Sequence, residues 1–357
     1  MKTITIKSTF REYSVEFIED FTIPLKKEVS SGGLPIIDKG VFKIYEKQLR
    51  NAIGNNYILI EANEQNKTLD KCKELIEVLV KKGVRRNQKL IAVGGGVIQD
   101  IVGFTASILY RGVEWIFFPT TLLAQADSCV GSKTSINASG AKNLLGTFYP
   151  PAHIYIDTEF LETLSTDEIK SGIGEMMHFY LYANSPYFEK LIQNYESAFK
   201  NRKLFSDYIR ESLSIKKSVA EVDEFDRGER NKFNYGHTFG HALESVTDYK
   251  INHGQGVTVG MDLANFLSWK LGFMEEKTFQ GLHSRLTINF PAYKLESIDL
   301  ETYIKALSKD KKNIGANIGC ILAEAPGKLV KKQIPADDNL KKLLKEYFST
   351  IFKTSPQ

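Results

Sequence analysis

The chain has 357 residues, 42% hydrophobic and 25% charged, which is the composition of a globular protein large enough for two well-filled domains. Its net charge of +4 is small, and no basic run with interleaved aromatic residues occurs, so we expect no nucleic-acid partner. No apolar run approaches the roughly 18 residues of a membrane span, so we expect no membrane partner.

Cysteine usage indicates the compartment. Cys72, Cys129 and Cys320 are far apart in the sequence and form no CxxC pair. An odd number of separated cysteines argues against a disulfide framework and is typical of a reducing environment. The first ten residues alternate threonine, isoleucine and charge; they predict an edge strand and lack the apolar core of a signal peptide. We therefore expect a cytoplasmic protein.

Strand and helix patterns alternate through the first part of the chain. Short apolar segments predict strands at residues 57–60, 89–93 and 113–118. Apolar residues at helical spacing predict a helix over residues 68–82, and a second helix is expected over 98–109. This alternation is typical of an α/β domain with a parallel, doubly wound sheet.

The pattern changes near residues 155–160. Ser165 or Thr166 is placed to cap a helix that carries Asp167 and Glu168 in its first turn. Helical spacing of apolar residues then dominates towards the C-terminus. We therefore expect an α/β domain over residues 1–157 and a mainly α-helical domain over residues 158–357.

Three consecutive glycines, residues 94–96, stand between the strand expected at 89–93 and the helix that follows it. Glycines at this place let a phosphate approach the backbone, where the helix N-terminus supplies N–H donors and a positive dipole. The carboxyl end of a parallel strand is also a common ligand position. A tight turn without a ligand would use the same glycines, so the motif alone is weak evidence.

Three of the six histidines, His237, His241 and His253, fall in one short glycine-containing stretch. His237 and His241 are four residues apart and would share one face of a helix. One or both could bind a divalent metal, and a carboxylate such as Glu175 could complete a catalytic zinc site with an open position. The alternative is a pair of hydrogen-bonded core histidines, but the glycines and the third histidine favour a metal.

Polar and basic residues elsewhere suit an anionic substrate. Segments 127–133 and 141–143 each contain a lysine, and Lys216, Arg230 and Asn234 precede the histidines. Their ammonium, guanidinium and amide groups could bind a phosphate or a carboxylate. Taken singly, such residues are more often solvated at the surface.

In this order the motifs resemble those of the sugar phosphate cyclases, most closely the 3-dehydroquinate synthase family. The resemblance runs through most of the chain. It is carried by residues 63–68, 94–100, 111–112, 119–121, 127–133, 142–143, 160–163, Glu175, Arg230, Asn234, His237, His241, His253 and 310–312.

The resemblance implies an N-terminal NAD-binding domain, a C-terminal metal-binding domain and an active site in the cleft between them. Zinc, with cobalt as a possible substitute, would be bound by Glu175, His237 and His253. The residues implied for NAD binding are Asp38, Glu64, Lys67, Gly95, Gly96, Val97, Ile98, Gln99, Asp100, Thr120, Thr121, Asp127, Lys133, Lys142, Phe160, Leu161, Glu162 and Thr163.

The resemblance also implies which residues are catalytic and how the chain assembles. The family is typically homodimeric, and Arg111 would act across the dimer interface. His241 would face the substrate instead of the metal. The implied catalytic residues are Arg111, Asp127, Lys133, Lys142, Asn143, His178, Lys216, Arg230, Asn234, His241 and Lys311.

The implied substrate is a phosphorylated seven-carbon keto-acid sugar. Arg230 and Asn234 favour a substrate that carries a carboxylate. NAD would oxidise a hydroxyl that zinc polarises, and phosphate would then leave by β-elimination. Return of the hydride, ring opening and an intramolecular aldol reaction would close the carbocycle and give 3-dehydroquinate. NAD would thus be regenerated within one turnover.

The sequence departs from the family pattern at several motif positions. Asn63, Gln99, Ser132 and Ala141 each replace a glycine, and Asp226 replaces a glutamate. In addition, His178 replaces a lysine three residues after Glu175. On a helix His178 would lie one turn beyond Glu175, so we expect it to approach the metal-bound substrate and to alter substrate preference.

Three alternatives stay open. A sister cyclase could act on another sugar phosphate, including an amino variant. A metal-dependent alcohol or glycerol dehydrogenase would share the fold, although Lys133 and the Lys142-Asn143 pair argue against it. A homologue without catalytic activity could be retained for binding.

Overall fold

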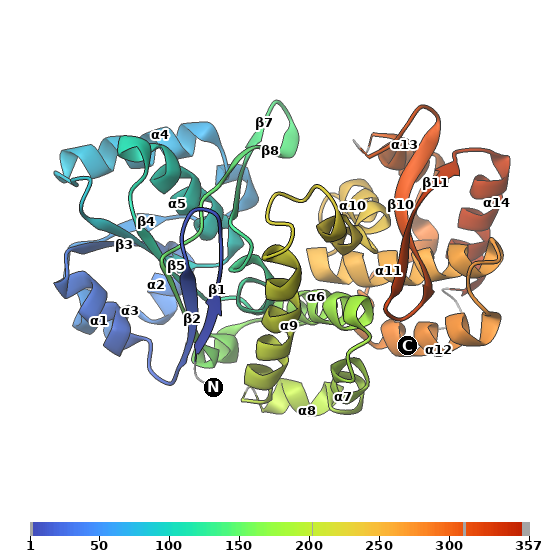
Figure 1. The fold of residues 1–357 in the computed structure, drawn as a ribbon, viewed down its shortest axis with the longest axis horizontal. Helices are drawn as coiled ribbons and strands as arrows, with labels where there is room; N and C mark the ends of the chain where they lie inside the picture. The colour runs from blue at the N-terminus through green and yellow to red at the C-terminus, as the bar shows by residue number, and fades with distance from the viewer. Residues whose placement is uncertain (1–2, 202, 310–311, 352–357) are drawn as a thin grey trace. The chain divides into compact units, whose positions relative to one another are not determined.

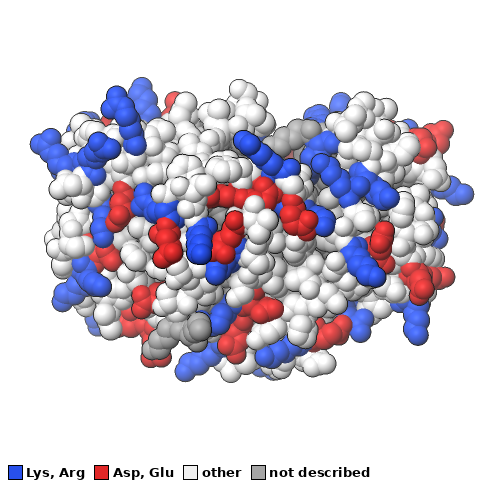
Figure 2. All heavy atoms as spheres, in the orientation of Figure 1, with Lys and Arg blue, Asp and Glu red and all other residues white. Residues whose placement is uncertain are grey.

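The computed structural model describes residues 3–201, 203–309 and 312–351, which divide into two compact units (Figure 1). Unit 1 comprises Met1–Ser165 and Lys200–Asp226, and unit 2 comprises Thr166–Phe199 and Arg227–Gln357. Among the described residues, no helix has both the length and the apolar character needed to span a membrane. Figure 2 shows basic and acidic side chains interspersed over the visible face, as the small net charge leads one to expect.

Unit 1 is built on a seven-stranded sheet in the order β1-β2-β9-β6-β5-β3-β4. Only β1 and β2 pair antiparallel; the other neighbours are parallel. The strands are β1 (Thr3–Ile6), β2 (Tyr13–Ile18), β3 (Gly33–Asp38), β4 (Ile58–Ile60), β5 (Lys89–Gly94), β6 (Trp115–Pro119) and β9 (His153–Asp157).

Helices and turns connect these strands. Thr68 caps α4 by accepting a hydrogen bond from Lys71 N, and the helix buries Cys72, Leu75 and Leu79. The connecting elements are α1 (Thr22–Ser30), α2 (Lys39–Ile44), α3 (Glu46–Ile53), η1 (Glu64–Asn66), α4 (Leu69–Lys81), α5 (Gly96–Ile108), η2 (Leu109–Arg111), η3 (Ala124–Ser128) and η4 (Thr158–Thr163), with an antiparallel hairpin of β7 (Lys133–Ala138) and β8 (Ala141–Phe148).

The sequence correctly predicted the class of this unit and several of its elements. The expected strands at 57–60, 89–93 and 113–118 correspond to β4, β5 and β6, and the expected helices to α4 and α5. The expected edge strand is β1, at the end of the sheet. Strand β3 was not predicted; it contains Pro35, a residue that usually disfavours a strand with neighbours on both sides.

One helix of unit 1 comes from later in the chain. Helix α9 (Leu204–Ala220) packs on η3, where Ser212 donates a hydrogen bond to Ala126 O at 2.9 Å. Its Arg210 guanidinium lies 4.0 Å from the centre of the Phe17 ring. These contacts place residues 200–226 in unit 1, so the observed division differs from the single expected boundary between residues 157 and 158.

Unit 2 is mainly α-helical, as predicted, and its helix α6 begins at Thr166. Its elements are α6 (Thr166–Ala183), α7 (Tyr187–Gln193), α8 (Tyr195–Lys200, its last residue in unit 1), η5 (Glu229–Asn234), α10 (His237–Val246), α11 (His253–Lys270), α12 (Glu276–Leu286), η6 (Thr287–Asn289), η7 (Leu295–Ser297), α13 (Leu300–Ser308), β10 (Asn317–Ala325), β11 (Lys328–Pro335), α14 (Asp338–Glu346) and η8 (Tyr347–Ile351). The β10–β11 hairpin was not predicted.

Candidate active site

The carboxyl ends of the parallel strands in unit 1 carry most residues that the resemblance assigned to NAD. Strand β3 ends at Asp38, β5 ends at the glycines, β6 ends before Thr120, and β9 leads into η4, which contains Phe160–Thr163. Strand β4 lies on one side of β3, and the next strand in the sequence, β5, lies on the other side. The direction in which strands are added to the sheet therefore reverses at β3. Ligands of open α/β sheets bind at such reversals.

The glycine turn after β5 has the shape that a phosphate needs. A Cβ on Gly95 would lie 3.0 Å from Thr121 Cγ2, so only glycine fits easily there, whereas Gly96 faces more open space. Gly95 precedes α5 and no side chain caps this helix, which leaves its first N–H groups for a ligand. The turn therefore fits a dinucleotide phosphate.

A polar network joins this turn to the β7–β8 hairpin. The buried Lys67 ammonium donates to Asp100 Oδ2 at 3.1 Å and to Asn143 Oδ1 at 2.6 Å, and it lies 3.3 Å from Glu64 Oε1. Ser135 donates through its N–H and its hydroxyl to Asp100, at 2.8 and 2.9 Å. Burial raises the pKa of Asp100, although Lys67 and Ser135 act against that shift.

The basic residues expected to contact substrate in unit 1 have different surroundings. Lys216 on α9 is buried and donates to the carbonyl oxygen of Asp127 at 2.7 Å and to its Oδ1 at 2.6 Å. Lys133 forms an ion pair with Asp226 at 2.6 Å, while Lys142 is exposed on β8. Arg111 is exposed at the end of η2.

Glu175, His237 and His253 meet in unit 2. The Glu175 Oε1 atom lies 3.1 Å from His253 Nε2 and 3.4 Å from His237 Nε2, and the Glu175 side chain is almost fully buried. Burial opposes ionisation of Glu175, but the two imidazoles hold the pKa of its carboxyl well below the usual value. One carboxylate oxygen and two imidazole nitrogens suit zinc or cobalt and leave a coordination position open.

The other ring nitrogens of both histidines are held by neighbours. His253 Nδ1 is 2.9 Å from Glu244 Oε1, and His237 Nδ1 is 3.2 Å from the carbonyl oxygen of Tyr235. Each acceptor favours the tautomer with a proton on Nδ1 and a free lone pair on Nε2. Both Nε2 atoms face Glu175, so with a metal bound between them these tautomers would present their lone pairs to it.

Glycines allow the three helices of this cluster to approach one another. A Cβ on Gly174 of α6 would lie 2.0 Å from the carbonyl oxygen of Gly254 on α11, and one on Gly254 would lie 1.7 Å from Ser171 O. A Cβ on Gly260 would lie 2.0 Å from Gly236 O, next to α10. The Gly-Glu, Gly-His and His-Gly pairs of the sequence thus give close backbone contacts that bring the metal-binding side chains together.

The other predicted residues of unit 2 have different surroundings. The ring centre of His241 is 5.4 Å from that of His237. The His241 side chain is exposed, whereas that of Glu175 is buried. Lys312 donates to Asn234 Oδ1 at 3.3 Å. Arg230 is buried in η5. Lys311, the expected lysine, lies outside the described residues.

The structure places His178 differently from what was expected of a residue that contacts substrate. It has no exposed surface, and its Nδ1 atom lies 3.7 Å from Glu175 Oε2. The sequence also missed Glu244 and Tyr235 as partners of the histidines. Glu244 lies two turns after His237, which was a weak signal, but a backbone carbonyl such as that of Tyr235 gives none.

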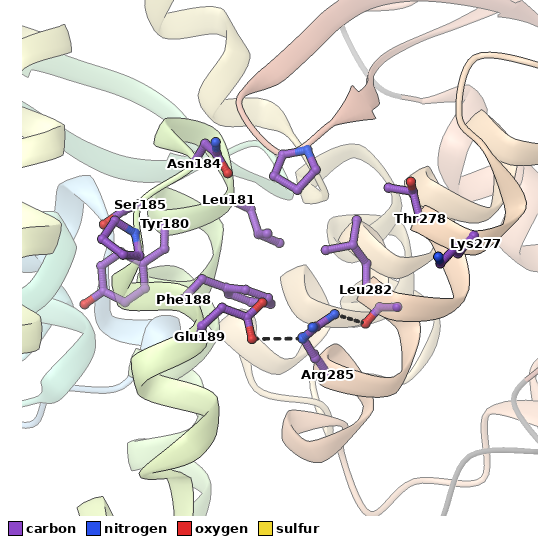
Figure 3. Close-up of a pocket in the computed structure, with 13 residues that line it drawn as sticks. Tyr180, Leu181, Asn184, Ser185, Phe188, Glu189, Lys277, Thr278, Leu282 and Arg285 are labelled. Carbon is purple, nitrogen blue, oxygen red and sulfur yellow. Dashed lines mark hydrogen bonds and ion pairs between the residues drawn. The ribbon is translucent and has the colours of Figure 1, made fainter.

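A pocket of about 430 Å³ lies elsewhere in unit 2, between α6, α7 and α12 (Figure 3). Phe188 and Leu282 form part of its lining, and Glu189 and Arg285 form an ion pair at 3.0 Å at its edge. None of the predicted site residues lines it.

Comparison with known proteins agrees with the fold and shows the family. The model of the 3-dehydroquinate synthase N-terminal domain matches residues 57–171, and that of the C-terminal domain matches residues 172–313. The 3-dehydroquinate synthase of Thermoanaerobacter pseudethanolicus is 34% identical over 355 residues, which cover 96% of this chain and 100% of the relative. The chain therefore belongs to the 3-dehydroquinate synthase family.

Two solved structures are similar over nearly the whole chain. A 2-deoxy-scyllo-inosose synthase, complexed with carbaglucose-6-phosphate, NAD+ and Co2+, has a TM-score of 0.87 and 26% identity and covers 96% of this chain and 99% of its own. The 2-epi-5-epi-valiolone synthase of Streptomyces hygroscopicus, with NAD+ and Zn2+ bound, has a TM-score of 0.84 and 23% identity and covers 97% and 99%. At 23% identity, the similarity to the valiolone synthase shows a shared fold and no more.

Proposed function

We propose that the chain is a carbon–oxygen lyase that converts a phosphorylated seven-carbon keto-acid sugar to 3-dehydroquinate with loss of phosphate. The observation that carries the proposal is the convergence of Glu175 Oε1 with the Nε2 atoms of His237 and His253. The glycine turn at the strand ends of unit 1 supports the NAD part of the chemistry. Both features lie in a chain of the family that the comparisons show.

The cofactors proposed are NAD and one divalent metal, zinc or cobalt, as in the two similar cyclase structures. When bound, the metal would polarise a substrate hydroxyl and NAD would accept and return a hydride. Glu175 brings negative charge to the metal, and the Nδ1 contacts of both histidines fix the direction of their Nε2 lone pairs.

The proposed roles of the other residues follow from their chemistry. Lys216 fixes Asp127 by one hydrogen bond to its backbone carbonyl oxygen and one to its carboxylate. Lys133, Lys142 and Asn143 are assigned to the anionic groups of the substrate, and Arg230 with Asn234 to its carboxylate. A guanidinium can bind a carboxylate with two parallel hydrogen bonds, which an ammonium cannot do.

A phosphate-release assay with a panel of sugar phosphates tests this function. The metal-loaded protein with NAD far below the substrate concentration should release phosphate from the seven-carbon acid over many turnovers, with 3-dehydroquinate as product. His237→Ala combined with His253→Ala should abolish turnover. Release from another sugar phosphate alone would indicate a sister cyclase, accumulation of NADH would indicate a dehydrogenase, and no turnover of any substrate would favour a binding protein.

The assembly and location are further proposals. The resemblance supports a homodimer with Arg111 at the interface, where sedimentation analysis would give twice the chain mass. The three cysteines are free and buried, which supports a reducing, cytoplasmic environment.

A further inference from the structure

His178 lies beside Glu175 and also contacts the ring of His237. Both residues belong to α6 and are three positions apart, so they lie on nearly the same helix face. Glu175 Oε1 faces His237 and His253, whereas Oε2 is the atom that lies 3.7 Å from His178 Nδ1. This distance is an ion-pair or dipolar contact and is too long for a hydrogen bond.

Aromatic rings hold His178 in place. Its ring centre is 5.0 Å from that of Phe179, 5.8 Å from that of Phe233 and 6.2 Å from that of Tyr235. The His237 ring meets it edge to face at 5.1 Å. A flat imidazole suits this enclosure, whereas a lysine would bring a full charge into surroundings from which water is excluded.

We propose that His178 is a positioning residue that fixes the Glu175 carboxylate and the His237 ring in the orientation needed for metal binding. The inference rests on the metal centre of the proposed function. His178 contacts both residues from the buried side, so it sets their geometry without contact with substrate. The Nδ1 contact with Oε2 and the packing against the His237 ring would together hold these side chains so that Glu175 Oε1 and His237 Nε2 converge. Removal of its nitrogens should therefore weaken metal binding even where the ring volume is kept.

The test compares three variants of the full chain. His178→Phe keeps an aromatic ring, His178→Leu gives a smaller apolar side chain, and His178→Gln keeps a polar donor and acceptor. The dissociation constant of Co2+ is measured by competition with a chromophoric chelator, together with the visible spectrum of the bound ion. We expect the Phe and Leu variants to bind about 10- to 100-fold more weakly with an altered spectrum, and the Gln variant to retain most of the affinity.

A partly buried histidine of unit 2 supplies the control. His283 lies 2.9 Å from Asp262 and is remote in sequence from the metal-binding residues, so His283→Gln should leave Co2+ affinity unchanged. Thermal unfolding of each metal-free variant shows whether it is folded, and either apolar variant suffices if the other does not fold. Unchanged affinity and spectrum in a folded apolar variant would overturn the positioning role alone. A wild-type protein that binds no Co2+ or Zn2+ would overturn the proposed metal centre as well.

Discussion

At the scale of single residues, Glu244 holds the ring of His253, one of the proposed metal ligands. Its carboxylate accepts the Nδ1–H of His253 at 2.9 Å, which orients the ring and makes Nε2 a stronger donor. We expect Glu244→Ala to weaken Zn2+ binding about 10- to 100-fold, and Glu244→Gln, which keeps a neutral acceptor, to weaken it less. Chelator competition measures both constants.

Glu189→Gln is the matched control for this prediction. Glu189 is an exposed glutamate of the same unit, and it pairs with Arg285 outside the histidine cluster. Its replacement should leave the zinc constant as in the wild type. Wild-type affinity in Glu244→Ala would show that this carboxylate does not support His253.

The family resemblance gave Glu175, His237 and His253 as the expected metal ligands, and the structure brings these three side chains together. The sequence could not supply Glu244 or the Tyr235 carbonyl, since these act through a proton on a ring nitrogen whose direction depends on tertiary structure. It also assigned His178 to the substrate from helical spacing. Spacing gives the helix face correctly, but it does not show that Phe233 of η5 packs on that face.

At the scale of elements, close contact between α6 and α11 brings Glu175 next to His253 in the proposed metal site. A Cβ at position 174 would lie 2.0 Å from a backbone oxygen of α11, which cannot move aside as a side chain would. Gly174→Ala should therefore push the helices apart, destabilise the fold by roughly 1–3 kcal/mol and weaken metal binding. Denaturant unfolding and metal titration measure the two effects.

Gly281→Ala in α12 tests whether any added methyl has this effect. Its Cβ would meet only the flexible end of Arg285, at 3.2 Å, and alanine favours a helix over glycine. We expect stability equal to or above that of the wild type, with metal affinity unchanged. Gly174→Ala behaving like Gly281→Ala would contradict the role of this helix contact.

Elements with clear periodicity were predicted, and those defined by distant partners were not. Helix α4 and strand β5 follow from their own side-chain patterns. Strand β3 contains a proline, and its place depends on β4 and β5 on either side. The β10–β11 hairpin turns at Pro326 and Gly327, but its flanking segments have few β-branched residues to indicate strands.

At the scale of the whole molecule, the two proposed cofactors should stabilise different units. A ligand present at 100 times its dissociation constant stabilises the state that binds it by about 2.7 kcal/mol. We expect Zn2+ to slow amide hydrogen exchange in α6, α10 and α11, and NAD+ to slow it at the ends of β3, β5 and β6. Exchange mass spectrometry with each ligand alone gives the comparison.

Removal of the metal with a chelator should reverse only the first set of changes. Protection of α6 by NAD+ alone, or of the glycine turn by Zn2+ alone, would contradict this assignment. The His237→Ala, His253→Ala double variant should lose the zinc effect and retain the NAD+ effect.

Because residues 200–226 complete unit 1, the order of synthesis matters for this chain. When residue 165 has been made, η3 still lacks α9, and Asp127 lacks its Lys216 partner. About 60 more residues must follow, which takes roughly 3–12 s at ribosomal rates. During that interval α6 emerges with Glu175 before either metal-binding histidine exists. The nascent chain therefore passes through a period in which neither unit can close, and this is the period in which it would most need a chaperone.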